Sequence, residues 1–467
     1  MRKNSMEKTK KRKDLDMLNG TLWNKLVLFA LPVAATALLE QLFNASDIAV
    51  VGNFTGELKT IAVAAVGANT SLIGLLVNLF VGIALGTNVV IANAIGRNDN
   101  ATVQKAVHTS IIIAVLGGVL IGGLGELAAE PIMNLLDVPQ DVFPYALMYL
   151  RIYLLGMPVI LLYNFEAAIF RSVGDTKTPL IALACSGVLN VLLNLFFVIV
   201  LKMTVNGVAV ATVISNAVSS AILLVILLKT DKCIRFEFKK LRFDFSCFKR
   251  IMRIGLPSGI QSAMFSISNI IIQGAINSLG TVVMAASSAA CNVELFAYFV
   301  LNAFSQACTT FVGQNYGAGK IDRCKKTLAL SLVEDAIATA TTIALVLLSG
   351  RFMLSIFNSD PEVVEIGYTR LKILFFAYAF TMTYEVISGY LRGFGISLTP
   401  AVIVMVGICV VRIIWIKTVF PVHHTFNTIM VAYPVSLCIT AIMMFIALLV
   451  YRPAKKHREN TAKYTNL

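Results

Sequence analysis

Charged residues are scarce in this chain. Asp, Glu, Lys and Arg together make up 14% of its 467 residues, whereas about a quarter of the residues of a typical soluble domain are charged. Hydrophobic residues contribute 57%, and the mean hydropathy is +0.80. These values exclude an ordinary soluble protein and indicate a chain that lies in a lipid bilayer.

The sequence also lacks the motifs that mark most catalytic, nucleotide and metal sites. It has no HExxH, GxSxG or Walker A motif, so we expect neither an enzyme nor an ATP-driven pump. No loop resembles a selectivity filter, which argues against a channel. The eight cysteines are scattered singly, without a CxxC pair or a histidine spacing that suits zinc. We therefore expect free thiols and no cofactor.

Long apolar segments, bounded by Gly, Pro, Asn or charged residues, are the dominant feature of the sequence. A helix that crosses a hydrocarbon core of about 30 Å needs about 20 apolar residues, and continuous apolar runs argue against a β-barrel. The sequence thus predicts an all-α integral membrane protein with twelve spans. They lie near 25–51, 61–94, 103–125, 144–170, 178–201 and 207–228, and near 250–276, 283–313, 325–349, 363–391, 399–420 and 427–451.

The first apolar segment is predicted to be a span, not a cleaved signal. It lacks a small-residue cleavage site and contains Glu40 and Asp47.

Positive charges are unevenly distributed along this chain, whose net charge is +14. Cytoplasmic loops of membrane proteins are rich in Lys and Arg. In this chain, all but eight of the 39 basic residues lie in the head, the tail, the central linker or every second loop, including the helix ends next to those loops. The segment near 126–142, in contrast, has four acidic residues and no basic one. We therefore expect both termini in the cytoplasm and the protein in the plasma (inner) membrane of a bacterium. The eight exceptions are Lys59, Arg151, Lys202, Arg351, Arg370, Lys372, Arg412 and Lys417.

A polybasic head, Lys8–Lys13, precedes the first span. Such a cluster next to a membrane helix is more often a topology and lipid-surface signal than a nucleic-acid site. We expect membrane lipids as partners and no nucleic acid.

The two halves of the chain share a motif at a fixed offset. The segment 171–179 and the segment 392–400 both read R-x-x-G-x-x-x-T-P, 221 residues apart, and Gly96 and Gly317 align at the same displacement. Repeats with an even number of spans are related by an axis along the membrane normal, with the substrate path between them. The predicted division is a head (1–24), an N-lobe (25–228), a linker (229–249), a C-lobe (250–452) and a tail (453–467).

Several residues, in this order and spacing, resemble the multidrug and toxic compound extrusion (MATE) family of the MOP flippase superfamily. They are Pro32 and Asn44-Ala-Ser-Asp47 in span one, Gly96-Arg-Asn-Asp99 after span two, the paired R-x-x-G-x-x-x-T-P loops, Asn190-Val-Leu-Leu-Asn194 in span five, and Asn206–Thr212 opening span six.

The resemblance covers essentially the whole chain. It implies two six-helix lobes that form a V around a central cavity. It also implies a secondary antiporter that exports organic, cationic and amphipathic compounds in exchange for Na⁺ or H⁺ by alternating access. We expect a small-molecule substrate and a monomer.

Polar residues inside the N-lobe spans suggest a site for the coupling ion. A carboxylate at mid-bilayer costs about 2.5–3.5 kcal/mol, so Asp47 needs a partner or a function. Asn190 and Asn194 share one helix face at i and i+4, and Thr212 adds a hydroxyl. Oxygen ligands of this kind suit a hard cation.

In the resembled family, the positions that match Asp47, Asn190, Asn194 and Thr212 form a cation site. Archaeal-type relatives have Asp where this chain has Asn194. With one acid fewer, Na⁺ coordination or a proton on Asp47 alone both remain possible, and Na⁺ is slightly favoured. The alternative interpretation of the amides is hydrogen bonding between helices, worth about 0.6 kcal/mol each.

Other embedded polar residues are candidates for the substrate cavity. Glu385 in span ten either contacts the substrate or forms a salt bridge with a base such as Arg412. Acids in the cavity would attract a cationic drug, and the remaining candidates are Glu40, Asn44, Glu166 and Glu294.

Two acids and three prolines complete the features inside the spans. Glu334 and Asp335 lie well inside span nine, and we expect them only to pack toward the bundle. Pro32, Pro158 and Pro257 interrupt apolar helices, where proline removes a backbone hydrogen bond and permits a bend.

A MOP-type flippase for a lipid-linked saccharide is the main alternative function. It would favour a basic cavity that holds pyrophosphate, whereas the embedded residues here are mainly acidic. A membrane enzyme or another non-transport protein is the second alternative, which the missing motifs disfavour.

Overall fold

A computed structural model of the chain describes residues 15–136 and 138–455. Every regular element among these residues is helical, which confirms the all-α prediction. The polybasic segment Lys8–Lys13, most of the tail and Asp137 lie outside the described residues.

The helices form two successive sets. The first consists of α1 (Trp23–Phe54), α2 (Lys59–Gly96), α3 (Asn100–Leu135), α4 (Phe143–Leu155), α5 (Met157–Ser172), α6 (Lys177–Leu195) and α7 (Val205–Lys229). The second consists of α8 (Phe245–Asn277), α9 (Thr281–Gly317), α10 (Ile321–Phe357), α11 (Pro361–Gly393), α12 (Leu398–Val404), α13 (Val411–Thr418) and α14 (Phe426–Tyr451). In the described part of the chain, eleven helical runs are long and apolar enough to cross a membrane, and the pair α4–α5 forms a bent twelfth span.

The break between α4 and α5 is the one place where a predicted proline bend ends a helix. The two helices meet at Gly156 with an angle of 50°, and Pro158 lies in the first turn of α5, where a missing backbone N–H costs nothing. In contrast, α1 and α8 continue through Pro32 and Pro257. At these two positions the proline does not interrupt the helix.

The predicted acidic loop near 126–142 is shorter in the structure, because α3 extends to Leu135. Glu126 and Glu130 therefore lie on a helix and not in a loop. Arg151 of α4 lies 3.6 Å from Glu126 and 3.9 Å from Glu130, so this acidic group has a basic partner from the neighbouring helix.

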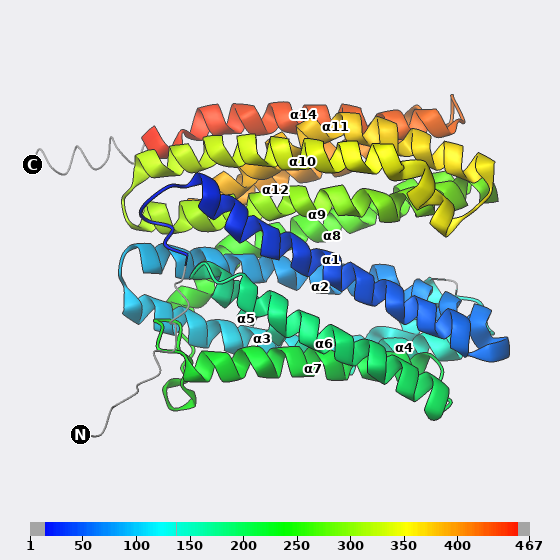
Figure 1. The fold of residues 1–467 in the computed structure, drawn as a ribbon, viewed down its shortest axis with the longest axis horizontal. Coiled ribbons are helices and arrows are strands. Elements are labelled where there is room, and N and C mark those ends of the chain that lie inside the picture. Colours follow the sequence, from blue (N-terminus) through cyan, green and yellow to red (C-terminus); the bar gives the residue numbers. More distant parts are fainter. Residues whose placement is uncertain (1–14, 137, 456–467) are drawn as a thin grey trace, which may run out of the picture.

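The two sets of helices pack as two lobes, the N-lobe (α1–α7) and the C-lobe (α8–α14), one below and one above in Figure 1. Glycines line their contact. A Cβ on Gly82 of α2 would overlap the backbone of Gly259 on α8, and a Cβ on Gly96 would overlap the carbonyl of Gln314 on α9. Small residues of this kind let helix backbones approach closely in a membrane. The two lobes therefore meet tightly along the second half of α2.

Helix α1 crosses from one lobe to the other. Its first half packs on the C-lobe, where Phe29 meets Phe311 of α9 edge to face at 5.8 Å between ring centres. Its second half packs on α6 and α7 of the N-lobe. One helix thus touches both halves of the molecule, as its diagonal course in Figure 1 shows.

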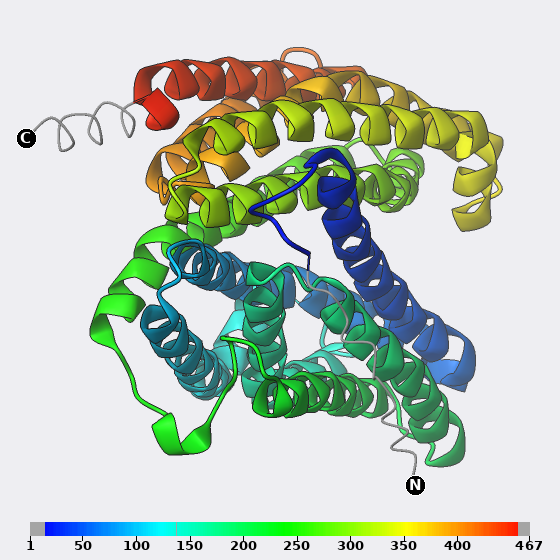
Figure 2. The same cartoon turned by 60° about the vertical axis from the view of Figure 1, so that its left-hand side comes forward.

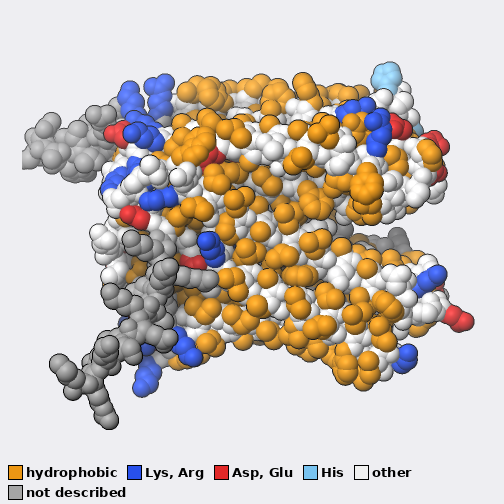
Figure 3. All heavy atoms as spheres, viewed as in Figure 1, with side chains coloured by type: hydrophobic (Ala, Val, Ile, Leu, Met, Phe, Trp, Pro, Cys, Tyr) orange, Lys and Arg blue, Asp and Glu red, His pale blue; other side chains and the backbone are white. Residues whose placement is uncertain are grey.

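Side-chain type varies along the length of the helices. Hydrophobic side chains cover the middle of the face in Figure 3. Lys and Arg lie at both ends, with the larger group on the left, at the end where α1 begins and α14 ends. This is the surface expected of a protein that crosses a bilayer.

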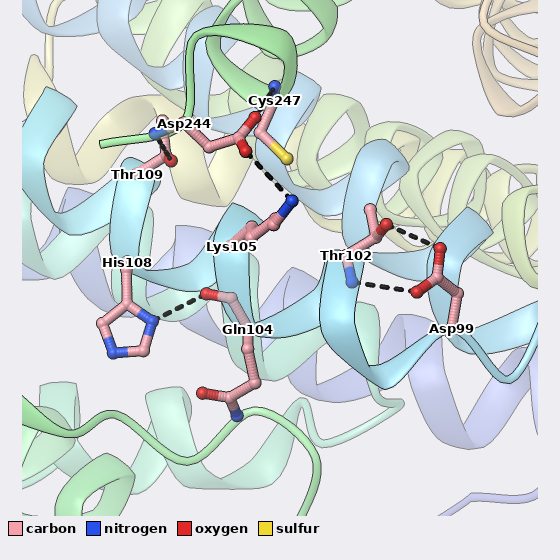
Figure 4. Close-up of polar contacts among 8 residues, drawn as sticks. All are labelled: Asp99, Thr102, Gln104, Lys105, His108, Thr109, Asp244 and Cys247. Atoms are coloured by element: carbon pink, nitrogen blue, oxygen red, sulfur yellow. Dashed lines mark hydrogen bonds and ion pairs between the residues drawn. The ribbon is translucent and has the colours of Figure 1, made fainter. Parts of the chain in front are cut away.

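The linker between the lobes is attached to α3 (Figure 4). His108 contacts two backbone carbonyls through its ring nitrogens, Gln104 O at 2.7 Å and Glu237 O at 3.2 Å. The Asp244 backbone N–H donates to Thr109 Oγ1, and Lys105 lies 3.4 Å from the Asp244 carboxylate. The predicted linker is therefore an ordered segment fixed to the N-lobe.

Candidate transport cavity and cation site

A cavity of about 620 Å³ lies between the lobes. Residues of both lobes line it, from α1, α2 and α4–α7 on one side and from α8, α9, α11 and α12 on the other. Its volume is within the range of about 300–1,000 Å³ that is typical of small-molecule sites. Figure 3 shows a notch between the lobes on the right, at the end opposite the start of α1. The charged residues that line the cavity are Glu40, Asp47, Arg171, Glu385 and Arg392.

The other end of the cavity is closed by hydrogen bonds between the lobes. The Gln314 side-chain amide donates to the carbonyl of Ser172 (2.6 Å), and Thr310 donates to Asn88 Oδ1 (3.0 Å). Together with the glycine contacts of α2, these bonds close the end at which α1 begins and α14 ends. The described conformation is therefore open only at the opposite end.

A strap formed by residues 15–20 strengthens this closed end. Figure 2 shows it, in dark blue, passing between the lobes before α1 begins. Met17 packs against Gly174 in the α5–α6 loop, and its carbonyl accepts hydrogen bonds from Asn315 (3.2 Å) and from Arg323 Nε (3.1 Å) of the C-lobe. Arg323 also donates to the carbonyl of Gly20 (2.8 Å). The strap thus joins the two lobes.

Four of the predicted site residues lie together in the N-lobe, and three of them, Asp47, Asn190 and Thr212, line the cavity. Asp47 Oδ1 accepts from the Asn194 side-chain amide (2.6 Å), and Asp47 Oδ2 accepts from Thr212 (3.0 Å). The same Asn194 amide also donates to Asn190 Oδ1 (3.2 Å), and the Asn190 amide donates to Thr212 (3.4 Å). The cluster therefore joins three helices, α1, α6 and α7.

The helices place these four side chains for simple reasons. Asn190 and Asn194 are one turn apart on α6, so their amides stack along one face. Directly after Asn194 the chain forms a π-helical segment, Phe196–Val200, a distortion that is frequent at functional sites.

The electrostatics of the cluster suit a small cation. Asp47 is only 5% exposed, and no Lys or Arg of the described chain lies within ion-pair distance of it. Asn194 Oδ1 is buried and has no hydrogen-bond partner among the described residues. One carboxylate with three neutral oxygens fits a monovalent cation, or a proton on Asp47. No group of three His, Cys, Asp or Glu side chains within the described ranges could hold a metal such as zinc.

The other predicted site residues divide into two groups. Glu40, Asn44 and Glu385 line the cavity. Glu385 is not within ion-pair distance of Arg412, which instead donates to Ser436 (2.9 Å).

Glu166 and Glu294 do not line the cavity, so their predicted placement was wrong. Glu166 is fully buried between α5 and α7, where Ser220 donates to it (2.9 Å). Glu294 accepts from Arg370 (3.1 Å) and from Tyr378 (3.1 Å) inside the C-lobe. Both carboxylates point into their own lobe, and hydrogen-bonding partners within that lobe hold them there.

Two cavity residues, Arg171 and Arg392, were not predicted from the sequence. They open the two copies of the R-x-x-G-x-x-x-T-P motif, which was interpreted as a pair of loops, yet both side chains line the cavity. Arg171 donates to Gln306 (3.3 Å) and Arg392 to Gln261 (2.8 Å). Their identical place in the two repeats was the signal that could have found them.

These features define a polytopic membrane transporter of two lobes around one central cavity. A family model described as MatE matches residues 32–196 and 257–416, one segment in each half of the chain. The chain therefore belongs to the MATE family of multidrug efflux transporters.

Curated relatives and solved structures agree with this assignment. The chain is 26% identical to the probable multidrug resistance protein YoeA of Bacillus subtilis, over 91% of this chain and 93% of the relative. It is also 26% identical to the probable multidrug resistance protein NorM of Thermotoga maritima, over 83% and 84%. A multidrug resistance MATE family transporter in its outward-facing conformation has the same fold, with a TM-score of 0.86, 21% identity, and coverage of 96% of this chain and 99% of that one.

Proposed function

We propose that this protein exports amphipathic organic cations in exchange for Na⁺ by alternating access. The observation that supports it most directly is the Asp47 cluster, in which Asp47, Asn190 and Thr212 line a drug-sized cavity and the buried Asn194 lies directly behind them. A proton on Asp47 is the alternative coupling ion.

The proposed orientation places the termini in the cytoplasm. The larger group of Lys and Arg in Figure 3 lies at the end where α1 begins and α14 ends, and basic residues favour the cytoplasmic side. The cavity then opens to the outside. The strap and the glycine seam, which we define as the close contacts of Gly82 with α8 and of Gly96 with α9, close the cytoplasmic end.

Coupling in this proposal depends on α1. A cation at Asp47 draws oxygens of α6 and α7 toward the second half of α1, while the first half of the same helix rests on the C-lobe. Binding in the N-lobe thereby changes how α1 bridges the lobes. Exchange requires that the cation and the substrate prefer different conformations.

The cavity lining favours a cationic substrate with aromatic character. Three acids, Glu40, Asp47 and Glu385, exceed the two arginines in number. Tyr153 and Tyr298 also line the cavity, and tyrosine faces attract organic cations. A cavity for a pyrophosphate-linked lipid would be expected to have an excess of basic residues.

Exchange of one Na⁺ for one monovalent cation moves no net charge across the membrane. The membrane potential, which supplies about 2.3 kcal/mol per charge per 100 mV, then does no work on such a cycle. We expect transport to follow the ion gradient alone.

Dye efflux from proteoliposomes under separate Na⁺ and proton gradients tests the proposal. We expect an imposed Na⁺ gradient to drive export of ethidium and Asp47→Asn to reduce that rate at least about tenfold, an effect of about 1.4 kcal/mol. Glu57→Gln, which removes an exposed carboxylate just after α1, is the matched control and should leave the rate unchanged. Efflux driven only by a proton gradient would assign the proton as coupling ion, and no efflux under either gradient would refute drug export.

A further inference from the structure

Helix α10 contains a buried carboxylate outside the cavity and outside the Asp47 cluster. Glu334 is 3% exposed, and neither of its carboxylate oxygens has a hydrogen-bond partner among the described residues. Buried polar groups are nearly always paired, so an unpaired pair of oxygens requires an explanation.

The face of α10 that contains Glu334 packs against α1 and α9. Leu330 and Ala338, one turn before and one turn after Glu334, pack against an apolar cluster built by α1 and α9. Phe29 of α1 and Phe311 of α9 belong to that cluster, and α1 contacts α10 directly. The first half of α1, which belongs to the N-lobe, thus lies against the helix face of the C-lobe that contains Glu334.

No hydrogen bond or ion pair joins Glu334 to a basic side chain of the described residues. Its neighbour Asp335 is fully buried and accepts a hydrogen bond from Thr339 (2.8 Å), and the charged group close to it is another acid, Glu385 of α11. The titratable group on the facing part of α9 is the thiol of Cys308, next to Ser331 of α10.

These surroundings select a proton over a metal cation. An ionised carboxylate without a partner is very costly in an apolar interior, and in practice such a group becomes neutral. Bound Na⁺ would need several oxygen ligands, whereas Leu330 and Ala338, at i−4 and i+4 on the face of Glu334, provide none.

We propose that Glu334 is a proton-binding site that is distinct from Asp47 and is linked to the docking of α1. Glu334 holds a proton while α1 covers it, and releases that proton to water when α1 leaves the C-lobe. Because only the covered state requires the proton, acid favours the docked position of α1. The release step rests on the proposed alternating access, which supplies the movement of α1.

Infrared spectroscopy of the reconstituted full chain tests whether Glu334 holds a proton. A protonated carboxyl group has a carbonyl stretching band that is separate from that of a carboxylate. We expect this band at neutral pH in the wild type, a partial loss of it in Glu334→Gln, and no change in the control Glu362→Gln, which alters an exposed acid of α11. Glu334→Asp, which keeps a carboxyl group, should keep the band at a shifted position. A band that Glu334→Gln leaves intact would overturn the proposal.

The fluorescence of Trp23 at the start of α1 tests the link to docking. The chain has two tryptophans, so Trp415→Phe leaves Trp23 as the single reporter. In an Asp47→Asn background, we expect a change in Trp23 emission with pH that Glu334→Gln abolishes. If that change persists in Glu334→Gln, the proton is merely structural and the proposal fails. Dye efflux and its loss in Asp47→Asn are measured separately, so failure here leaves the transport proposal standing.

Discussion

Asp47 in the N-lobe and Glu334 in the C-lobe are both buried acids, but their surroundings differ. In the N-lobe, Asp47 accepts hydrogen bonds from Asn194 and Thr212 and faces the cavity. In the C-lobe, Glu334 has no hydrogen-bond partner among the described residues and lies on the face of α10 that packs against α1. The same functional group therefore suits a cation with oxygen ligands in one lobe and a proton in the other. Because α1 both contains Asp47 and packs against the helix face that contains Glu334, one helix connects the two sites.

Replacing Asn194 by Asp would place two acids next to each other in the N-lobe site, as Glu334 and Asp335 are in the C-lobe. Two adjacent carboxylates repel each other, so one of them retains a proton more strongly. We expect Asn194→Asp to lower Na⁺-driven dye efflux about tenfold and to raise proton-driven efflux, an energetic change of about 1.4 kcal/mol. Efflux rates under each gradient measure this, with Asn194→Gln as the uncharged control. An unchanged preference would show that the charge of the site does not select the ion.

The glycine seam offers a way to separate the lobes. A Cβ on Gly82 overlaps the backbone of α8, whereas Gly123 of α3 has open space around its Cα. We expect Gly82→Ala to force the closed end apart and to reduce efflux several-fold, while Gly123→Ala has no effect. Accessibility of introduced cysteines in α2 to a water-soluble thiol reagent reports the opening. Equal behaviour of the two variants would contradict a tight seam.

Much of this structure was predictable from residue patterns. The twelve spans follow from apolar runs of about 20 residues, and the grouping of Asp47 with Asn190 and Asn194 follows from helical spacing and the family resemblance. What failed depended on the direction of side chains between helices. Glu166 and Glu294, like Glu40, are acids within long apolar segments. The sequence does not show that Ser220 and Arg370 hold Glu166 and Glu294 away from the cavity, because those contacts depend on how the helices pack.

The role of α1 as a bridge was also beyond the sequence. The sequence of one hydrophobic helix shows neither which helices it packs against nor that its two halves pack on different lobes. For the same reason Glu334 was interpreted only as packing toward the bundle, since the sequence does not show which helices pack against its face of α10.

The strap is a smaller contact between the lobes, and Arg323 is its main anchor on the C-lobe. Arg323 donates to the carbonyls of Met17 and Gly20, whereas Lys325 is an exposed neighbour whose contact is with Asp322. We expect Arg323→Ala to loosen the closed end and to change the efflux rate by about two- to fivefold, since hydrogen bonds to a charged group contribute about 1.5–3 kcal/mol and solvent competes for them here. Lys325→Ala should match the wild type. Protease cleavage within the strap, compared between the two variants, measures how firmly it is held, and equal cleavage would remove its anchoring role.

The smallest expected effect concerns the starts of α3 and α10, which occupy the same place in the two repeats. Asp99 caps α3 by accepting from Thr102, whereas Lys320 at the start of α10 provides no side-chain cap. The hydroxyl and backbone N–H of Thr102 lower the pKa of Asp99 below its ordinary value of 3.8. Asp99 therefore stabilises the folded protein above about pH 4 and loses this contribution as pH falls below that value.

We expect Asp99→Ala to lower the free energy of unfolding by about 1 kcal/mol at neutral pH, the usual value of a helix N-cap. Thermal unfolding of the purified protein in detergent measures the loss, which should shrink toward zero in acid. Lys320→Ala removes no cap, so its effect should instead follow the strap, through its bond to the carbonyl of Leu18. A pH-independent loss in Asp99→Ala would mean that the aspartate acts through packing and not as a charged cap.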